Sequence, residues 1–451
     1  MDYSEICLIF AIAITLVLWF CSQAIYIILS MQSRKLVSGS AATGDVRQFD
    51  TQLLYFTCSS LSADDRYLYV MSDRDFSSPN VFVRDLQTGE ERRLTDNREG
   101  TLKSYVYFDQ TPHLGLGKAS VCLDPQRNRI YYIQGDDVMT VGLDGNIRTL
   151  AQVPAGRMTA FTHVSACGRY LCVPMTDDRI LDYDPATEGA GLDRRPIYNI
   201  DGRVQREHLN SYLCVYDTTS GELLYEKRIP HCWITHVQFN PQNPDLIMYN
   251  NEWPETNCGI RRMWLYDHRS DSYVQLRTMG DDTLGNPAGY PRRAEDWVCH
   301  EMWSDDGQYI IYHGGYADGP AMVGRMCLAT RQYWEIALPA DYNAYGHFTM
   351  DHDQILCCDG YFKFPDEVKP VFDNSTDNGP DPHKKDGEYI SRVVPDWEKG
   401  TLQWIPLCKH RSDWLGQDAH PHPIYSHKGD RIFFNARNER DVKVYCVEVQ
   451  E

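Results

Sequence analysis

Positive charge is in short supply in this 451-residue chain. Its 44 lysines and arginines are outnumbered by 63 aspartates and glutamates, which gives a formal net charge of −19. Binding to phosphate backbones needs a basic surface, so this balance argues against nucleic acid as a partner. For the same reason, an anionic ligand would need a local positive centre, either a metal ion or clustered arginines.

Two spacings that would indicate familiar chemistry are missing. The 15 cysteines include no CxxC pair, and the chain is too long for a small disulfide scaffold. No G-x-S-x-G sequence occurs, which argues against a hydrolase of the prolyl-oligopeptidase type. Free cysteine acts as a small core residue in apolar strands, a use that favours a reducing compartment. The cysteines in such runs are Cys122, Cys172, Cys214, Cys357 and Cys446.

The N-terminal segment differs from the rest of the chain. Residues 6–30 carry no charge over 25 positions, which is enough to span a bilayer as one hydrophobic helix. The residues before this run are acidic (Asp2 and Glu5), whereas a signal peptide begins with a basic region. Arg34 and Lys35 follow the run, and the positive-inside rule then keeps the bulk of the protein in the cytoplasm.

We therefore predict an uncleaved membrane anchor in residues 1–35 and a linker in residues 36–49. Two alternatives remain open. The segment is removed as a signal peptide and the protein is secreted, or translation begins at Met31 and leaves a soluble cytoplasmic protein.

From about residue 50 onward, long apolar stripes at helical spacing are absent and a β unit of about 40 to 60 residues recurs. The clearest copy, residues 60–96, reads as four short strands separated by polar turns. Six related units begin near Val121, His163, His236, His300, His347 and His420. Repeats of this length and strand content are typical of β-propeller blades. The sequence thus predicts an all-β, seven-bladed β-propeller over residues 50–451; a β-solenoid is the alternative, although its repeats are usually shorter.

Four histidines share one position in the repeat. His236, His300, His347 and His422 each lie seven residues before the residue that marks the first turn of their unit, namely Asn243, Gly307, Gln354 and Gly429. The first strand of a propeller blade lines the central channel, so equivalent positions converge at one end of it. The alternative is that these histidines are packing residues, each satisfied by a backbone carbonyl.

The stretch GQDAHPHP, residues 416–423, adds further donors at the start of the last unit. Residues two apart in a strand point to the same side, so His420 and His422 can present two imidazoles to one point. Gln417 is near enough to add an amide oxygen. With His300 in the same phase, this donor set suits a borderline transition metal such as Mn, Fe, Ni or Zn.

The chain resembles the oligogalacturonate lyases, seven-bladed propeller enzymes of pectin breakdown, over roughly residues 210–450. The sequences that carry the resemblance are CWITHVQFNP (232–241), RRMWLYD (261–267), CHEMW (299–303), GHFTMDHDQILCCDG (346–360), CKHRSDW (408–414) and GQDAHPHP (416–423). In that family the histidine of HExW and the Q-x-x-H-x-H residues bind manganese. The resemblance therefore implies a Mn²⁺ site and a catalytic base, His236. The implied metal ligands are His300, Gln417, His420 and His422.

One position departs from the family pattern. Where the family has an arginine in the strand before a T-G-E turn, this chain has Tyr212 in SYLCVYDTTSGE. Tyr212 is a candidate acid toward the leaving oxygen, and Arg206 or Arg262 is a candidate replacement for the arginine at the substrate carboxylate. His347, at the shared phase, is predicted to bind substrate.

These residues predict a metal-dependent lyase that acts on short oligogalacturonides by β-elimination. Its partners would be an oligouronide substrate and, through residues 6–30, a membrane; no protein partner is predicted. The alternative is a non-catalytic, TolB-like propeller that keeps a structural metal and binds a glycan or a protein.

Overall fold

The structure is a computed structural model, and fifteen stretches of the chain can be described. They are residues 47–50, 52–72, 79–97, 121–181, 204, 206–252, 262–277, 296–317, 319–338, 342–343, 346–362, 389–410, 412, 420–438 and 441–449. The predicted anchor, residues 1–35, and Gln417 lie outside the described residues. Among the described residues, none of the helical segments has the length and apolar character needed to cross a bilayer.

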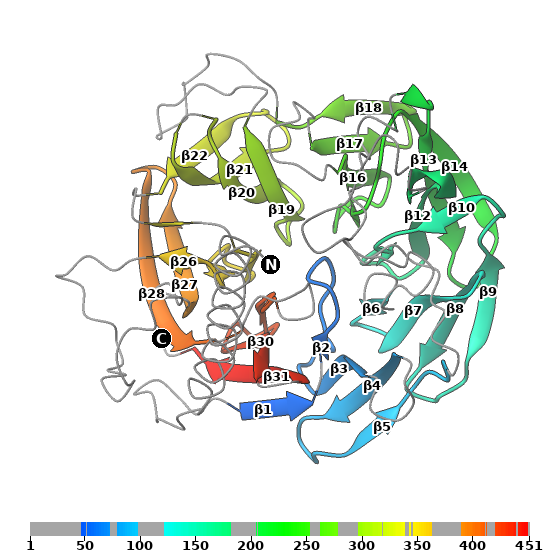
Figure 1. Ribbon diagram of the computed structural model, residues 1–451, viewed down its shortest axis with the longest axis horizontal. Coiled ribbons are helices and arrows are strands. Elements are labelled where there is room, and N and C mark those ends of the chain that lie inside the picture. The colour runs from blue at the N-terminus through cyan, green and yellow to red at the C-terminus, as the bar shows by residue number, and fades with distance from the viewer. Residues whose placement is uncertain are drawn as a thin grey trace, which may run out of the picture.

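The strands form seven antiparallel sheets arranged as a ring of blades around a central axis (Figure 1). The first three blades comprise β2 (Gln52–Leu53), β3 (Tyr67–Ser72), β4 (Asn80–Asp85) and β5 (Glu91–Arg93); β6 (Cys122–Asp124), β7 (Arg129–Gln134), β8 (Asp137–Gly142) and β9 (Arg148–Gln152); and β10 (Arg157–Thr159), β11 (His163–Val164), β12 (Tyr170–Asp177), β13 (Asn210–Asp217) and β14 (Leu223–Pro230). The fourth and fifth comprise β15 (Val237–Phe239), β16 (Leu246–Asn250), β17 (Met263–Asp267) and β18 (Ser272–Gln275); and β19 (Trp297–Trp303), β20 (Tyr309–Gly315), β21 (Ala321–Cys327) and β22 (Tyr333–Ala337). The sixth and seventh comprise β24 (Phe348–Met350), β25 (Leu356–Cys358), β27 (Tyr389–Asp396) and β28 (Thr401–Lys409); and β29 (Ile424–Tyr425), β30 (Arg431–Asn438), β31 (Asp441–Glu448) and β1 (Arg47–Asp50). A small extra sheet pairs β23 (Tyr342–Asn343) with β26 (Tyr361–Phe362).

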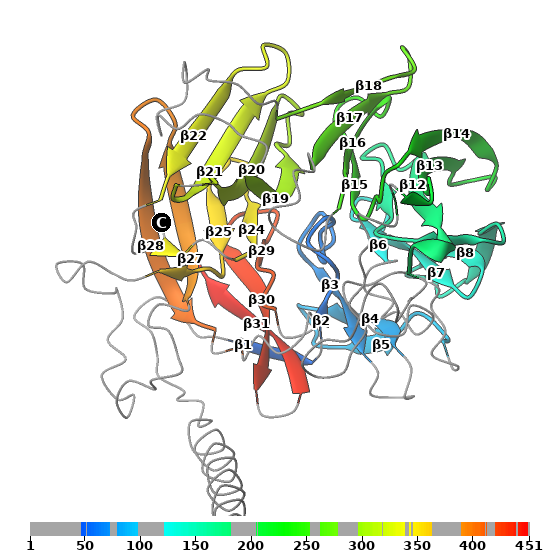
Figure 2. The same cartoon turned by 45° about the horizontal axis from the view of Figure 1, so that its top comes forward.

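The predicted all-β, seven-bladed propeller is confirmed, with one correction at its start. β1 pairs antiparallel with β31, from Arg47 opposite Cys446 to Asp50 opposite Lys443. Residues 47–49, assigned above to the linker, therefore supply the outermost strand of the last blade (Figure 2). An unpaired edge strand is a liability, and pairing the start of the domain with its last blade covers the edge of β31.

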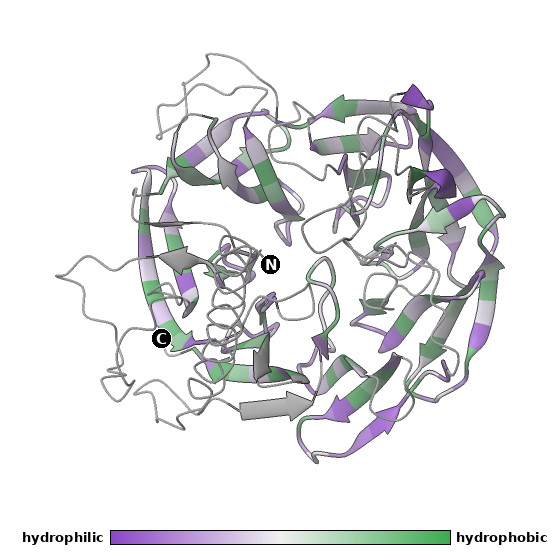
Figure 3. Ribbon diagram, in the orientation of Figure 1, coloured by the Kyte–Doolittle hydropathy of each residue, from purple (hydrophilic) through white to green (hydrophobic). Residues whose placement is uncertain are grey.

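The core lies between the blades, because each sheet packs on both of its neighbours. The inner strands are therefore apolar on both faces, as in β7, where Ile130, Tyr131, Tyr132 and Ile133 are all buried. The outermost strands alternate and carry charge, as β14 does with exposed residues on one side (Figure 3). This arrangement leaves the first strand of each blade to face the centre of the ring.

Three of the four turn positions used to align the repeat adopt the left-handed backbone conformation. Gly307, Gln354 and Gly429 have φ values of 66°, 62° and 74°. A shared conformation at the aligned position supports the register on which the histidine phase depends.

Candidate metal and proton-transfer site

The histidines that share a phase come together at the start of successive blades. His347 lies at the centre of the group: its ring centroid is 4.6 Å from that of His300, 3.8 Å from that of His422 and 5.1 Å from that of His420. His300 belongs to β19, His347 directly precedes β24, and His420 and His422 precede β29. Three blades thus contribute imidazoles to one place.

His347, His420 and His422 form the tighter set, since one ligand atom from each lies within 4.8 Å of the other two. The sequence prediction assigned His347 to substrate binding, whereas the structure places it among the candidate ligands. His300 was predicted to share a metal with His420 and His422; it lies beside His347, but its ligand atom groups with other residues, Cys299 and His313.

Asp359, which follows β25, orients this set. Its carboxylate accepts hydrogen bonds from His347 Nδ1 at 2.8 Å, from the His347 backbone N–H at 2.5 Å and from the His422 backbone N–H at 3.0 Å. Burial raises the pKa of Asp359, but the contacts with His347 outweigh burial and hold this pKa below its usual value. An ionised carboxylate only accepts, so His347 carries its proton on Nδ1 and keeps a lone pair on Nε2 for a metal.

Asp359→Asn is expected to weaken divalent-metal binding about 10- to 100-fold, since it removes the charge that orients and polarises His347. Titration calorimetry with Mn²⁺ measures the effect. The matched control is Asp353→Asn, an exposed aspartate in the same blade, whose side chain is 69% accessible. Equal affinities for the two variants would contradict the orienting role of Asp359.

Two of these histidines adopt a backbone conformation that non-glycine residues rarely take. The φ angle is 53° at His300 and 44° at His422. Left-handed non-glycine residues store strain and concentrate at functional sites. At His300 the pKa is held well below its usual value, mainly by burial and then by the neighbouring His347 and His313. A neutral imidazole is the form that binds a metal, so the donor set fits the transition ion that the sequence predicts.

His236 directly precedes β15 of the fourth blade, next to the blade of His300, and belongs to a buried charge network. Arg262 donates from Nη1 to Glu252 at 2.8 Å and from Nε to Glu301 at 2.9 Å, and its Nη2 lies 3.0 Å from His236 Nδ1. The side chains of this network are all buried, namely those of His236, Glu252, Arg262 and Glu301. Asn250 holds the same segment, because its Oδ1 accepts the backbone N–H of His236 at 2.7 Å.

The contact with Arg262 decides where His236 carries its proton. A guanidinium only donates, so at 3.0 Å His236 Nδ1 accepts and the neutral ring carries its proton on Nε2. The second acidic neighbour, Glu301 Oε1, lies 3.9 Å from the same Nδ1. Burial raises the pKa of Glu301, but Arg262 and His236 outweigh burial and hold it at about 2. Glu301 is therefore an anion, and it can accept a hydrogen bond from Nδ1 only in the other tautomer, in which Nδ1 carries the proton.

Of the three other residues predicted to contact substrate, only Arg262 reaches the site. Tyr212 lies on β13, where its hydroxyl donates to Asp177 at 3.2 Å and its ring packs under Arg157 at 3.7 Å. β13 is the third strand of the path β10-β12-β13-β14, and Tyr212 packs against the core between the second and third blades and does not join the histidines. Arg206 is about half exposed and lies 3.9 Å from Glu207.

Aromatic side chains from the first blade contact both His236 and the histidine set. The loop after β2 reaches toward the centre of the ring, where it is drawn in blue (Figure 1). Its Phe56 ring lies 6.1 Å from the His236 ring, 4.9 Å from His300 and 5.9 Å from His422, measured between centroids. Tyr55 contacts His236 at 5.4 Å. The Phe56 ring therefore contacts both His236 and the histidine set.

The sequence reasoning did not find Asp359, Glu252, Tyr55, Phe56 or His313. Of these residues, only Asp359 has a sequence feature that could have identified it, because it directly follows an apolar strand in the LCCDG segment.

Comparison with solved structures shows what the fold is similar to. One match is an oligogalacturonate lyase in complex with manganese, with 17% identity and a TM-score of 0.65 over 91% of this chain and 95% of that one. Another is an oligogalacturonate lyase from Vibrio parahaemolyticus, with 16% identity and a TM-score of 0.63 over 91% of this chain and 99% of that one. The chain shares the propeller fold of these two lyases. No protein-family model and no curated protein sequence matches it.

Proposed function

We propose that the protein is a metal-dependent lyase that cleaves short oligogalacturonides, or a related oligouronide, by β-elimination. The observation that carries this proposal is the presence of two groups of buried polar side chains on either hand of Phe56, which contacts both. One is the His347, His420 and His422 set, and the other is a buried histidine with an arginine and two carboxylates around it. The matching fold of a manganese-bound lyase supports it.

The chemistry needs both groups. The C5 proton of a uronate is too weakly acidic to be removed unless the charge that develops on the adjacent carboxylate is stabilised. A divalent ion, most suitably Mn²⁺ as in the similar lyase, supplies that stabilisation as a Lewis acid. The residues to hold it are His347, His420 and His422. Gln417 and His300 were also predicted as ligands, and Gln417 remains a candidate outside the described residues.

His236 moves the proton. Its Nε2 takes the C5 proton, the C5–H electron pair forms the C4=C5 double bond, and the C4–O pair leaves with the glycosidic oxygen. The imidazolium of His236 then returns the proton to that oxygen, so no water is consumed. In this scheme His236 serves as both base and acid, so a separate acid such as Tyr212, whose hydroxyl donates to Asp177, is not required.

The base role requires a change of hydrogen-bond partner at His236. In the structure Arg262 holds the tautomer with the proton on Nε2. We propose that a substrate carboxylate draws the Arg262 Nη2 away from His236. The His236 Nδ1 then carries the ring proton and donates a hydrogen bond to the Glu301 carboxylate. Nε2 then has a free lone pair. The same movement lets Arg262 neutralise an anionic substrate in a protein of net charge −19.

A non-catalytic propeller is the second candidate, and one observation favours it. Tyr55, Phe56, His236, His300, His347 and His422 are all at least nine-tenths buried in the structure. A channel that stays closed would leave a metal in a purely structural role, and the protein would bind a glycan or a protein elsewhere.

Digalacturonate cleavage distinguishes the two candidates. The Mn²⁺-loaded protein is expected to produce an unsaturated uronate, seen as a rise in ultraviolet absorbance, and treatment with EDTA is expected to abolish the rise. A protein that holds its metal but gives no such product on any oligouronide would overturn the lyase proposal and leave the structural role.

A further inference from the structure

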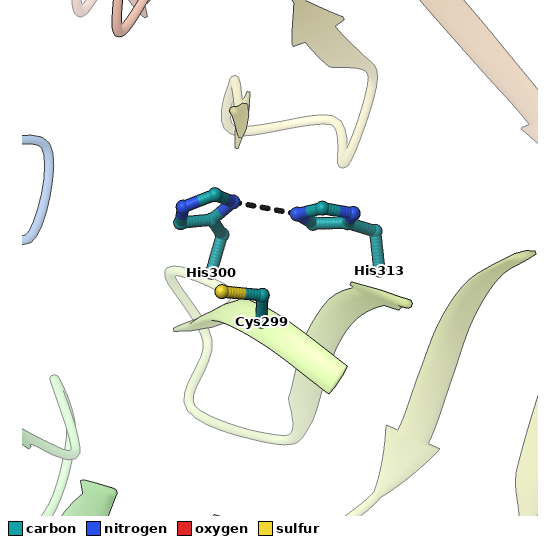
Figure 4. Close-up of side chains that lie close together, drawn as sticks. All are labelled: Cys299, His300 and His313. Carbon is teal, nitrogen blue, oxygen red and sulfur yellow. Dashed lines mark hydrogen bonds between the residues drawn. The ribbon is translucent and has the colours of Figure 1, made fainter. Parts of the chain in front are cut away.

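Three of the histidines at the shared position of the repeat are held by a neighbouring side chain, but not in the same way. The ring of His300 lies against His313, with 2.5 Å between His300 Nδ1 and His313 Nε2 (Figure 4). The ring of His347 is held by the Asp359 carboxylate. His236 differs, because the arginine that contacts its ring belongs to a circuit of hydrogen bonds that returns to the backbone of His236 itself.

This hydrogen-bonded circuit runs through Asn250 and Glu252. Asn250 Oδ1 accepts the backbone N–H groups of Thr235 at 2.9 Å and of His236 at 2.7 Å. Asn250 Nδ2 donates to Glu252 Oε2 at 2.8 Å. Glu252 Oε1 accepts from Arg262 Nη1 at 2.8 Å, and Arg262 Nη2 lies 3.0 Å from His236 Nδ1. The main chain and the ring of His236 are therefore held by one continuous set of contacts.

The Thr235 hydroxyl adds a second link to the circuit. It donates to Glu252 Oε2 at 2.8 Å and accepts from Asn250 Nδ2 at 2.8 Å. Thr235 and Asn250 are 0% exposed and Glu252 is 3% exposed, so water does not compete for these bonds. Breaking one of them leaves a buried polar group without its partner, which is costly. The circuit is therefore a rigid support for the arginine.

The two carboxylates beside Arg262 are not equivalent. Glu252 accepts from Arg262 and also from the two side chains that complete the circuit. Glu301 accepts from Arg262 Nε through its Oε2, while its Oε1 has no hydrogen-bond partner among the described residues. Glu301 Oε1 lies 3.9 Å from His236 Nδ1. Glu252 therefore fixes the arginine, whereas Glu301 keeps an oxygen open toward His236.

We propose that Asn250 is a positioning residue, which sets the orientation and the tautomer of His236 through Glu252 and Arg262. While Glu252 holds Arg262 at Nη1, the guanidinium donates from Nη2 to His236 Nδ1, and the proton of the neutral ring stays on Nε2. Without Asn250 the support loosens, and both tautomers of His236 become populated. The effect on catalysis rests on the proposed function, whereas the effect on the tautomer does not.

Heteronuclear NMR of the imidazole nitrogens measures the tautomer directly. The sample is the full-length protein without substrate, loaded with diamagnetic Zn²⁺ in place of Mn²⁺, and the His236 signals are identified by their loss in His236→Ala. In the wild-type protein, Nδ1 is expected to give the chemical shift of an unprotonated nitrogen and Nε2 that of a protonated one. In Asn250→Ala the two shifts are expected to move toward each other.

The matched control is Asn80→Ala in the first blade. Asn80 is 1% exposed, and its Oδ1 likewise accepts a backbone N–H, that of Asn97 at 2.8 Å. This variant is expected to lose a similar amount of stability and to leave the tautomer of His236 unchanged. The comparison separates a general loss of stability from positioning of the histidine.

Thr235→Val provides a second variant in case Asn250→Ala does not fold. It removes the hydroxyl that donates to Glu252 and is expected to mix the tautomers of His236 to a smaller extent. If the wild-type protein is active, either variant should lower kcat with little change in KM or in metal content. For Asn250→Ala the loss in kcat is expected to be about 10- to 100-fold, as for a misplaced catalytic group.

The outcomes for the positioning role and for the lyase proposal can be told apart. A tautomer of His236 that is already mixed in the wild-type protein, or that stays unchanged in every variant that folds, would overturn the positioning role. The same change in Asn80→Ala would overturn it too. A change confined to Asn250→Ala and Thr235→Val, in a protein that cleaves no uronide, would retain the positioning role and remove only the lyase proposal.

Discussion

His236→Ala is expected to lower kcat for oligouronide cleavage about 10²- to 10⁴-fold, the range that a positioned acid–base group contributes. The Mn²⁺ content is expected to stay unchanged, because His236 does not belong to the histidine set that would hold the ion. The measurement is the ultraviolet rise on digalacturonate at saturating substrate, with metal content determined on the same sample.

The control for this prediction is His352→Ala, which removes an exposed histidine in the sixth blade whose side chain is 51% accessible. It is expected to have wild-type turnover. If the wild-type protein is active and His236→Ala keeps its rate, His236 is not the proton-transfer group and the search moves to Tyr55, whose ring lies 5.4 Å from it. If the wild-type protein is inactive, the failure belongs to the proposed function and not to His236.

The repeat made the fold predictable, because seven units of similar strand pattern have few other ways to bury their apolar faces. The same repeat predicted which histidines converge, since equivalent positions of successive blades meet at the channel. The pairing of β1 with β31, which completes the last blade, could not be predicted from the repeat in the same way. Its four residues pair with β31 through backbone hydrogen bonds, which leave little trace in the side chains.

The site residues that were missed depend on contacts between segments far apart in the chain or on local backbone irregularity. Asp359 reaches His422, 63 residues away, and no spacing rule predicts that contact. The contact between His300 and His313 follows a shift in the register of β19 and β20, which interrupts the alternation that a strand pattern assumes. Tyr212 is a different case: it was assigned to the site from a motif position, and in the structure its hydroxyl donates to Asp177 and its ring packs against Arg157, so its catalytic role stays a prediction.

Arg262→Leu is expected to destabilise the fold by about 3–5 kcal/mol, because it leaves Glu252 and Glu301 buried without their cation. Both carboxylates are at most 3% exposed, and Arg262 bonds to each. Chemical denaturation or the melting temperature measures the loss. The matched control is Arg66→Leu, which breaks the Arg66–Asp85 pair in the first blade; the Arg66 side chain is 39% accessible, so solvent screens this pair and the expected loss is much smaller.

The loss should also depend on pH in a direction that identifies its cause. In the wild-type protein the pKa of Glu301 is about 2, below its unfolded value, so its contribution to stability is present at neutral pH and is lost only as pH falls toward 2. Without Arg262, the burial that opposes ionisation raises this pKa above the unfolded value, so stability falls as pH rises. The gap between Arg262→Leu and the wild type should therefore be larger at about pH 8 than at about pH 5. A gap of the same size at both values, or one as small as that of Arg66→Leu, would show that the buried carboxylates do not depend on Arg262.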